Sequence, residues 1–425
     1  MLALNICSWI ALAIVVALLL LVLFEPALRY AVQQPPAAPD SEEFLRVVGA
    51  LADAELHRRS RVELLADGKT FYPAELKAIG RAAHSVHVEA FIFDPGEVGD
   101  RFLRALVEAA RRGVRVKVVV DAIGSRPTPD RFFQPLREAG GQVRWYQPLR
   151  LATFKRWNNR THRELIVIDG TVGFIGGAGI ADHWDPGDKG KPPWRDMMFR
   201  VEGALVVGLQ TAFAENWVES SGQILSDPAD FPAAARRECG ATDGLVVIST
   251  PTAGRSTRAR VLFQLLLASA RRTVHIHSPY FLPDRSATDE LTRAVRERKV
   301  EVRVIVPGEA NNHPSARLAS RRRYGPLLKA GVEIHEYQPG MIHTKTMTVD
   351  GRWVVVGSTN FDSRSFDLND EVNLVAADPD LAARVEERFT ADLAQCRRVT
   401  YEQWLRRPLR ERILATLGRI LERQE

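Results

Sequence analysis

The sequence predicts an α/β protein of two duplicated halves, each with a largely parallel or mixed sheet flanked by helices, behind an N-terminal transmembrane helix. Three observations support this prediction. A sequence unit occurs twice at a period near 185 residues, helical and strand patterns alternate inside each copy, and residues 2–24 carry no charge. Two copies at so long a period indicate a duplicated domain, since solenoid repeats are roughly 20–50 residues long.

Residues 1–30 are predicted to be a membrane anchor. The 23 residues from Leu2 to Phe24 carry no charge, and a helix of that length spans the roughly 30 Å hydrocarbon core of a bilayer. The run is longer than the apolar region of a signal peptide, and no clean cleavage site follows it, which favours an anchor over a cleaved leader. Residues 31–60 are interpreted as a Pro-rich linker and a leading helix, which separate the membrane from the folded part.

The two copies match segment by segment. The matching pairs are 79–93 with 267–281, 112–120 with 298–306, 135–148 with 326–339, and 162–170 with 343–351. The first copy alternates helical patterns at 74–83, 100–112 and 135–139 with apolar strands at 86–93, 114–120 and 165–168, which is typical of an α/β fold. Repeat 1 is placed at 61–228 and repeat 2 at 235–400. Residues 149–160 form an insertion in the first copy, and residues 401–425 are predicted to form an amphipathic helix that packs on its own domain.

Composition and charge narrow the possible functions. Hydrophobic residues make up 45% and charged residues 26% of the 425 positions, which excludes a disordered or fibrous protein. The formal net charge of +6 is compatible with an anionic substrate or surface but does not specify a fold. Cys7, Cys239 and Cys396 belong to no CxxC or Cys/His cluster, so we interpret them as free thiols rather than zinc ligands.

The second copy carries a motif with a chemical rationale. His343, Lys345 and Asp350 are followed by Gly357-Ser358-Thr359-Asn360. Strand-like alternation over 341–349 predicts that His343 and Lys345 point to the same face. A neutral imidazole can attack phosphorus or protonate a leaving oxygen, and a lysine stabilises the charge that develops on phosphoryl oxygens. Ser358 and Asn360 can donate hydrogen bonds to the same oxygens.

These residues resemble the HKD motif of the phospholipase D superfamily, which occurs once in each half. Residues 361–373, together with 176–182 and 194–196 of the first half, look like the bacterial cardiolipin synthase branch. The resemblance covers about residues 60–400. It implies that the halves pack around a pseudo-twofold axis and bring both motif histidines into one cleft. One histidine would become a transient phosphohistidine and the other would act as acid and base, with no metal or cofactor.

The resemblance also implies residue roles. The candidate catalytic residues are His162, His343, Lys345, Asp350, Asn360, Glu371, Asp169 and Asp196, and the candidate substrate-binding residues are Ser358, Gly357 and Gly177. Glu371 and Asp196 would orient the histidines. Asp169 and Asp350 each end a motif strand before a glycine, so fixing that turn explains them at least as well as chemistry does.

The first motif departs from the family pattern. Glu164 stands at the position of the family lysine, and Gly179 at that of the asparagine. Replacing a positive by a negative charge at about 5 Å, with an effective dielectric near 20, could cost on the order of 6 kcal/mol. Three explanations are open: a cation from Lys155, Arg156, Arg160 or Arg163 fills in, Glu164 is protonated or serves as an acid/base group, or the first half has decayed.

The leading interpretation is a phosphatidyltransferase anchored in the cell (inner) membrane. It would join two phosphatidylglycerols, or phosphatidylglycerol and another phospholipid, into cardiolipin. The alternatives are a phospholipase D or nuclease-type phosphodiesterase and a lipid-binding pseudoenzyme. Phospholipid and membrane are therefore the expected partners, and nucleic acid is not, because the arginines are scattered rather than gathered in one groove.

Overall fold

The computed structural model describes residues 9–10, 12–15, 29–34, 37–148, 158–185, 190–251, 257–312 and 314–408 of the chain. Most of the predicted anchor (1–8, 11 and 16–28), most of the insertion (149–157) and residues 409–425 of the predicted C-terminal helix lie outside these ranges. Among the helices that are described, none is long and apolar enough to cross a bilayer.

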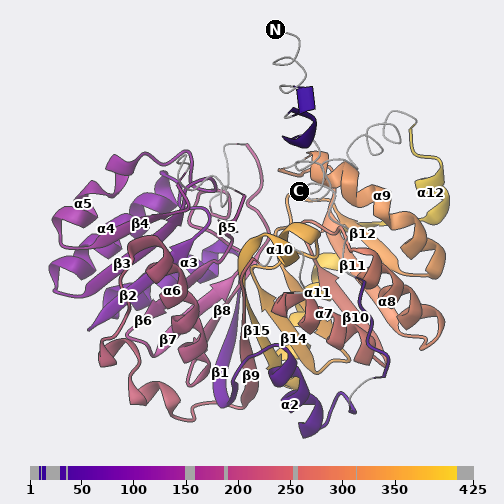
Figure 1. The fold of residues 1–425 in the computed structure, drawn as a ribbon, viewed down its shortest axis with the longest axis horizontal. Coiled ribbons are helices and arrows are strands. Elements are labelled where there is room, and N and C mark those ends of the chain that lie inside the picture. The colour runs from indigo at the N-terminus through magenta and orange to yellow at the C-terminus, as the bar shows by residue number, and fades with distance from the viewer. Residues whose placement is uncertain are drawn as a thin grey trace.

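A sixteen-stranded mixed sheet runs through both halves of the described chain (Figure 1). The strands of the first half are β1 (Leu56–Ala66), β2 (Ser85–Ala90), β3 (Arg115–Asp121), β4 (Gln142–Tyr146), β5 (Arg160–Thr161), β6 (Leu165–Ile168), β7 (Val172–Gly176) and β8 (Met197–Glu202). Those of the second half are β9 (Thr242–Ser249), β10 (Thr273–His277), β11 (Glu301–Pro307), β12 (Glu333–Tyr337), β13 (Thr346–Val349), β14 (Trp353–Gly357), β15 (Asn369–Ala377) and β16 (Cys396–Val399). Outward from the centre, the order β1-β8-β7-β6-β2-β3-β4 repeats as β9-β15-β14-β13-β10-β11-β12, which confirms the predicted duplication.

The prediction of one separate sheet in each half is wrong, because β1 belongs to both halves. Its first part pairs antiparallel with β9 through Leu56, His57 and Ser60, and its second part pairs antiparallel with β8 over residues 61–66. The strand begins inside the stretch that was expected to be a linker and leading helix. A segment upstream of the repeat therefore joins the two sheets into one.

Helices cover both faces of this sheet. They are α2 (Glu42–Leu51), α3 (Gly68–Arg81), α4 (Glu97–Arg111), α5 (Gln134–Glu138), α6 (Leu205–Ser221), α7 (Arg258–Ser269), α8 (Arg285–Arg296), α9 (Pro314–Ala330), α10 (Ser363–Asp367), α11 (Pro379–Leu393) and α12 (Tyr401–Leu405). Helices α3–α5 enclose the core of the first half, and α2 and α7–α9 enclose that of the second. A third core spans both halves, since Trp217 of α6 and Leu381 of α11 share it with Val246 of β9 and Val372 of β15.

The segment that precedes β1 is docked on the second half. The hydroxyl of Tyr30 donates to Asp284 at 2.7 Å, and the guanidinium of Arg260 lies 5.4 Å from the centre of the Tyr30 ring. Farther along, Phe44 of α2 packs edge-on against Trp353 at 5.4 Å between ring centroids. The described part of residues 30–51 is thus held against the protein surface, in contrast to the free spacer expected from the sequence.

Asp169 and Asp350 tie helices to strands at the end of the sheet opposite the motif histidines. Asp169 accepts hydrogen bonds from the backbone N–H groups of residues 83–85 at 2.7–2.9 Å, at the connection from α3 to β2. Asp350 accepts them from residues 271–273 at 2.7–3.0 Å, at the connection from α7 to β10. Both adopt positive φ, 51° and 56°, in a tight turn before a glycine. The structure therefore gives both residues a structural role and removes them from the candidate catalytic set.

The first prediction concerns this turn. Replacing Asp350 by Ala removes the acceptor of three backbone N–H groups, so we expect the free energy of unfolding to fall by about 1–3 kcal/mol. Urea unfolding followed by tryptophan fluorescence measures the change. Glu108→Ala, on the exposed face of α4, is the matched control and should change stability by less than about 0.5 kcal/mol. An Asp350→Ala protein as stable as this control would contradict the structural role.

Candidate active site

The two motif histidines line one cavity at the junction of the halves. The cavity has a volume of about 330 Å³. Its lining residues are Phe91, Ile92, Ile123, Arg160, His162, Tyr280, Asn312, Ala316, His343, Asn360, Asp362, Arg364, Ser365 and Asn369. His162 and His343 keep 9% and 6% of their surface exposed, so each ring is packed in protein yet borders the cavity. Residues 181 positions apart in sequence thus meet around one space.

Each histidine is held by a carboxylate of the other half. Nδ1 of His162 lies 3.0 Å from Oε1 of Glu371, and Nδ1 of His343 lies 3.0 Å from Oδ2 of Asp196. Such a bond favours the tautomer with the proton on Nδ1 and leaves Nε2 as the acceptor or nucleophile. The backbone makes the same kind of contact between the halves: the N–H of His162 donates to the Asp370 carbonyl, and the N–H of His343 donates to the Arg195 carbonyl.

Charges around the second histidine favour its neutral form. Burial and, next, the nearby ammonium of Lys345 lower the pKa of His343 to about 4, against the opposing effect of Asp196. Burial also lowers the pKa of Lys345, to about 8, while Asp196, Glu371 and Glu164 oppose this shift. Although burial raises the pKa of Asp196 and of Glu371, their histidine partners outweigh it, and the net shift of both is downward. Both carboxylates are therefore ionised at neutral pH.

Lys345 lies directly on the His343 ring. Its Nζ is 3.0 Å from Nδ1 and 3.2 Å from Nε2 of that ring, and it donates to the His343 carbonyl at 3.0 Å. Strand β13 begins only at Thr346, so the histidine and lysine precede the strand instead of lying within it as predicted. The contact between the two side chains nevertheless agrees with the prediction that they point to the same face.

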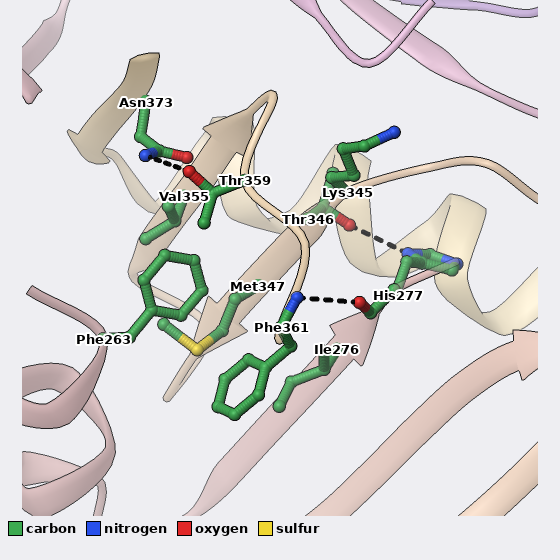
Figure 2. A pocket seen from close by; sticks show the side chains of 11 residues that line it. Phe263, Ile276, His277, Lys345, Thr346, Met347, Val355, Thr359, Phe361 and Asn373 are labelled. Carbon is green, nitrogen blue, oxygen red and sulfur yellow. Dashed lines mark hydrogen bonds between the residues drawn. The ribbon is translucent and has the colours of Figure 1, made fainter. Parts of the chain in front are cut away.

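A network beneath Lys345 fixes the motif. A small cavity of about 10 Å³ has Lys345 among its lining residues. Apolar side chains such as Phe263 and Met347 also line it, and the lysine ammonium is directed away from them (Figure 2). On its polar side, Nδ1 of His277 lies 2.8 Å from the Thr346 hydroxyl, and the Phe361 N–H donates to Ser278 at 3.0 Å. These bonds hold the start of β13 and the turn after β14 in one position.

The residues of the two glycine turns, at 176–179 and 357–360, differ in where they lie relative to the cavity. A Cβ on Gly357 would lie 2.1 Å from the Val372 carbonyl oxygen, so position 357 requires glycine for space. A Cβ on Gly177 would lie 3.0 Å from Nζ of Lys345, so a side chain there would press on the motif lysine. Ser358 is fully buried and donates to Glu371. The structure therefore places Ser358 behind a histidine-holding carboxylate rather than at the cavity, and Asn360 is the polar residue of this turn that lines it.

Glu164 is a buried hydrogen-bond acceptor in the first half. Its Oε1 accepts from the N–H groups of Phe91 and Ile92, both at 3.2 Å. A Cβ on Gly179 would lie 2.7 Å from the Ile92 carbonyl oxygen and 3.0 Å from the same Glu164 oxygen, so a side chain at 179 would crowd both groups. Burial raises the pKa of Glu164 well above its ordinary value, against the Ile92 N–H and the charge of Lys345. This environment favours the protonated form among the three explanations for the altered motif.

Arg163 and Arg160, two of the cations considered as replacements for the missing lysine of the first motif, lie in different places. Arg163 is buried on the other side of the strand, where it donates to the Ala212 carbonyl at 2.6 Å and to Glu215 at 3.1 Å. Arg160 lines the cavity. Lys155 and Arg156 lie outside the described residues.

Several aromatic side chains of the site, and Asn369, were given no role in the sequence analysis, although Trp194 and Asn369 lie in segments that carry the family resemblance. Trp184 and Trp194 lie 5.5 Å and 5.4 Å from the His343 ring, and the Trp184 indole donates to Asp196 at 3.1 Å. Phe91 contacts the His162 ring edge-on at 5.1 Å. Trp194 and Asn369 each stand two residues before a histidine-holding carboxylate, and this shared spacing is the signal that could have identified them. Within the described residues, no cluster of three or more His, Cys, Asp or Glu residues is arranged to hold a metal ion.

Comparison with known proteins identifies close sequence relatives. A family model described as "Cardiolipin synthase, PLD-like domain" matches residues 76–183 and 264–393. A cardiolipin synthase of Geobacillus kaustophilus is 32% identical over 94% of this chain and 79% of its own length. The major cardiolipin synthase of Bacillus subtilis is 33% identical over 85% and 74%. The crystal structure of a phosphatidylserine synthase from Haemophilus influenzae shares the fold, with a TM-score of 0.68 at 15% identity over 89% of this chain and 99% of that one.

Glu164 accepts hydrogen bonds from the N–H groups of Phe91 and Ile92, and we call this arrangement the Glu164 clamp. Its contribution can be tested by measuring the stability of variants. Glu164→Lys removes the acceptor of two N–H groups and adds a cation near Lys345, so we expect the free energy of unfolding to fall by about 2–4 kcal/mol. Glu164→Gln keeps an acceptor oxygen of the same size and should stay within about 1 kcal/mol of wild type. Chemical denaturation measures both. Equal stability of the two variants would refute the clamp.

The charge of Lys345 makes a separate prediction about His343. Lys345→Met removes the positive charge that disfavours the imidazolium, so the pKa of His343 should rise from about 4 toward its ordinary value near 6.5. NMR titration of ¹³C-labelled histidine rings measures this, with the His343 signal assigned by its absence in His343→Gln. A pKa that stays constant or falls further would show that the ammonium does not act on this ring.

Proposed function

Because the chain belongs to the family of cardiolipin synthases with phospholipase D-like domains, we propose that it transfers a phosphatidyl group between phospholipid headgroups. The proposed reaction joins two phosphatidylglycerols into cardiolipin and releases glycerol. The observation that carries this proposal is the pair of crosswise-held histidines on one cavity. One neutral imidazole provides the nucleophile that a double displacement at phosphorus needs, and the other histidine, protonated on Nε2, provides the acid.

In the first proposed step, Nε2 of one histidine attacks the phosphorus of the donor lipid. The bond from phosphorus to the glycerol oxygen breaks, and the other histidine, which begins the step as an imidazolium protonated on both nitrogens, gives its Nε2 proton to that oxygen. Glycerol leaves, and the phosphatidyl group stays on the first ring as a phosphohistidine. The carboxylate at Nδ1 of each ring stabilises the positive charge that the ring carries during the step.

In the second step, the acceptor alcohol reverses this chemistry. Its hydroxyl gives the proton to the imidazole that acted as acid, its oxygen attacks phosphorus, and the P–N bond breaks. Both histidines return to their starting states. The overall change therefore needs no oxidant, reductant or other reactant beyond the two lipids.

Lys345 and Asn360 are the proposed ligands of the reacting phosphate. Lys345 lies on the His343 ring and supplies positive charge where the equatorial oxygens gain negative charge. Asn360 lines the same cavity and can donate from its amide. With Glu164 uncharged, the single lysine would serve the phosphate in both steps, and the cavity would not contain a second lysine from the first motif.

We further propose that the enzyme acts at the cell (inner) membrane. Residues 1–30 would form the anchor, on the basis of the uncharged run from Leu2 to Phe24 and the length needed to span a bilayer. The docking of Tyr30 on the second half supports a short connection between that anchor and the catalytic part.

The proposal is tested in membranes that lack cardiolipin. His162→Ala and His343→Ala should each reduce cardiolipin formation by at least about 10³-fold, since each removes a group essential to both steps. The double variant should be no worse than the single ones, because residues that act as a unit are not additive. Lipid analysis with phosphatidylglycerol as donor measures the product. Full activity in either single variant would rule the mechanism out.

Glu164 variants in the same assay separate an adapted first half from a decayed one. With the clamp described above, Glu164→Gln keeps activity and Glu164→Lys lowers it. If the first half has decayed, Glu164→Lys restores the family motif and raises activity. Cleavage of DNA without any lipid product would instead favour a nuclease-type phosphodiesterase.

A further inference from the structure

Because of the duplication, the surroundings of His162 and of His343 are built from corresponding positions. The residues at these positions differ between the two copies. Counting from the turn residues Asn360 and Gly179, Arg364 corresponds to His183 and Ser365 to Trp184. Arg364, Ser365 and Asn369 line the cavity on the side of His162. Around His343 the corresponding positions carry rings, since Trp184 and Trp194 pack on that histidine and His183 stacks on Trp194 at 4.7 Å. The polar and cationic side next to His162 is the polar wall of the cavity, whereas the rings pack behind His343 and are not among the described residues that line the cavity.

Two arginines from different halves meet at the polar wall. Arg160 belongs to the first half and Arg364 to the second, and both line the cavity. The positive charge of Arg160 acts on Arg364: burial lowers the pKa of Arg364, Asp362 opposes that shift, and Arg160 lowers it again. Since like charges repel at short range, an anion at this wall would replace repulsion by attraction.

Hydrogen bonds hold both guanidinium groups in place before any ligand arrives. Arg160 donates to the carbonyls of Asn159 and Gln147 at 2.6 Å and 2.8 Å, and lies 3.4 Å from Asp121. Arg364 donates to the side chain and the carbonyl of Asn158 at 2.9 Å and 3.1 Å. A guanidinium has five N–H donors, and three N–H groups of Arg160 contact acceptors within the described part of the chain, so counted over those residues two N–H groups remain for another acceptor.

This cationic pair is distinct from the lysine of the motif. Arg160 and Arg364 line the cavity and donate hydrogen bonds to residues 147, 158 and 159, whereas the ammonium of Lys345 lies on the His343 ring and donates to the His343 carbonyl. The site thus holds two positive centres with different hydrogen-bond partners. A reaction with one phosphodiester needs only one such centre, but cardiolipin formation brings two together, the reacting phosphate and the phosphate that the acceptor lipid carries.

We propose that Arg160 and Arg364 form a binding subsite for the phosphate of the acceptor, and so select anionic alcohols over neutral ones. This inference rests on the proposed phosphatidyl transfer and deepens it. The donor phosphate lies between the histidines at Lys345. The acceptor phosphate lies at the arginine pair, which directs the free glycerol hydroxyl of the acceptor toward the phosphohistidine.

A partition experiment tests the subsite. The full-length enzyme receives vesicles of phosphatidylglycerol together with ethanol and glycerol 3-phosphate. Three acceptors then compete for one intermediate and give cardiolipin, phosphatidylethanol and phosphatidylglycerophosphate. Product ratios are independent of the donor step and of the fraction of folded enzyme. In Arg364→Ala we expect both anionic acceptors to lose about 10–100-fold relative to ethanol, the effect of removing a charge-assisted contact.

Two further variants sharpen this test. Arg364→Lys keeps the charge but loses the two-pronged geometry, so it should shift the ratios less than Arg364→Ala. Arg104→Ala, on the exposed face of α4, is the matched control and should leave every ratio unchanged.

Three outcomes would overturn the subsite. Unchanged ratios in Arg364→Ala would show that the arginine does not select the acceptor. A loss of cardiolipin alone, with glycerol 3-phosphate unaffected, would indicate contact with the lipid surface rather than with a phosphate group. Loss of all three products in both Arg364 variants would assign the arginine to the reacting phosphate. If wild type forms none of the products, the proposed transfer function itself is wrong, and the subsite falls with it.

Discussion

The site depends on the exchange of carboxylates between the halves. His162 meets Glu371 and His343 meets Asp196, each at 3.0 Å, so neither half contains a complete catalytic pair of its own. A histidine needs a fixed tautomer to present Nε2 to a substrate, and that tautomer is set by a residue about 150 or 210 positions away in the chain. The continuous sheet and the third core, to which α6 and α11 both contribute, give the rigidity that such bonds across the junction require.

The environment of each histidine shows how duplication has allowed the copies to diverge. The second motif keeps its lysine and surrounds His343 with aromatic rings, which exclude water and lower the pKa of the imidazole. The first motif has exchanged lysine for Glu164 and asparagine for Gly179, and the two changes fit one another in space. A change that looks severe from the charge alone is accommodated because the glutamate accepts hydrogen bonds from the Phe91–Ile92 turn instead of facing a phosphate.

Much of the fold and part of the site could be predicted from the sequence. Alternating apolar patterns and the repeat at about 185 residues predicted the α/β duplication, and the shared cavity of His162 and His343 followed from the resemblance. The joining role of β1 could not be predicted, because a strand that pairs with two neighbours carries the same pattern as one that pairs with a single neighbour. Sequence also could not separate Ser358, which is buried behind Glu371, from Asn360, which reaches the cavity, since that distinction depends on tertiary packing.

The double pairing of β1 limits how the molecule can be divided. A fragment that ends before β9 would leave the first part of β1 without a partner, and a fragment that begins at β9 would expose the backbone of its central strand. Open edges of this kind promote association between chains. The two copies could therefore diverge residue by residue in evolution but could not easily be separated. Recombination that replaces one copy by that of a relative would have to preserve the pairing of β1 with both β8 and β9.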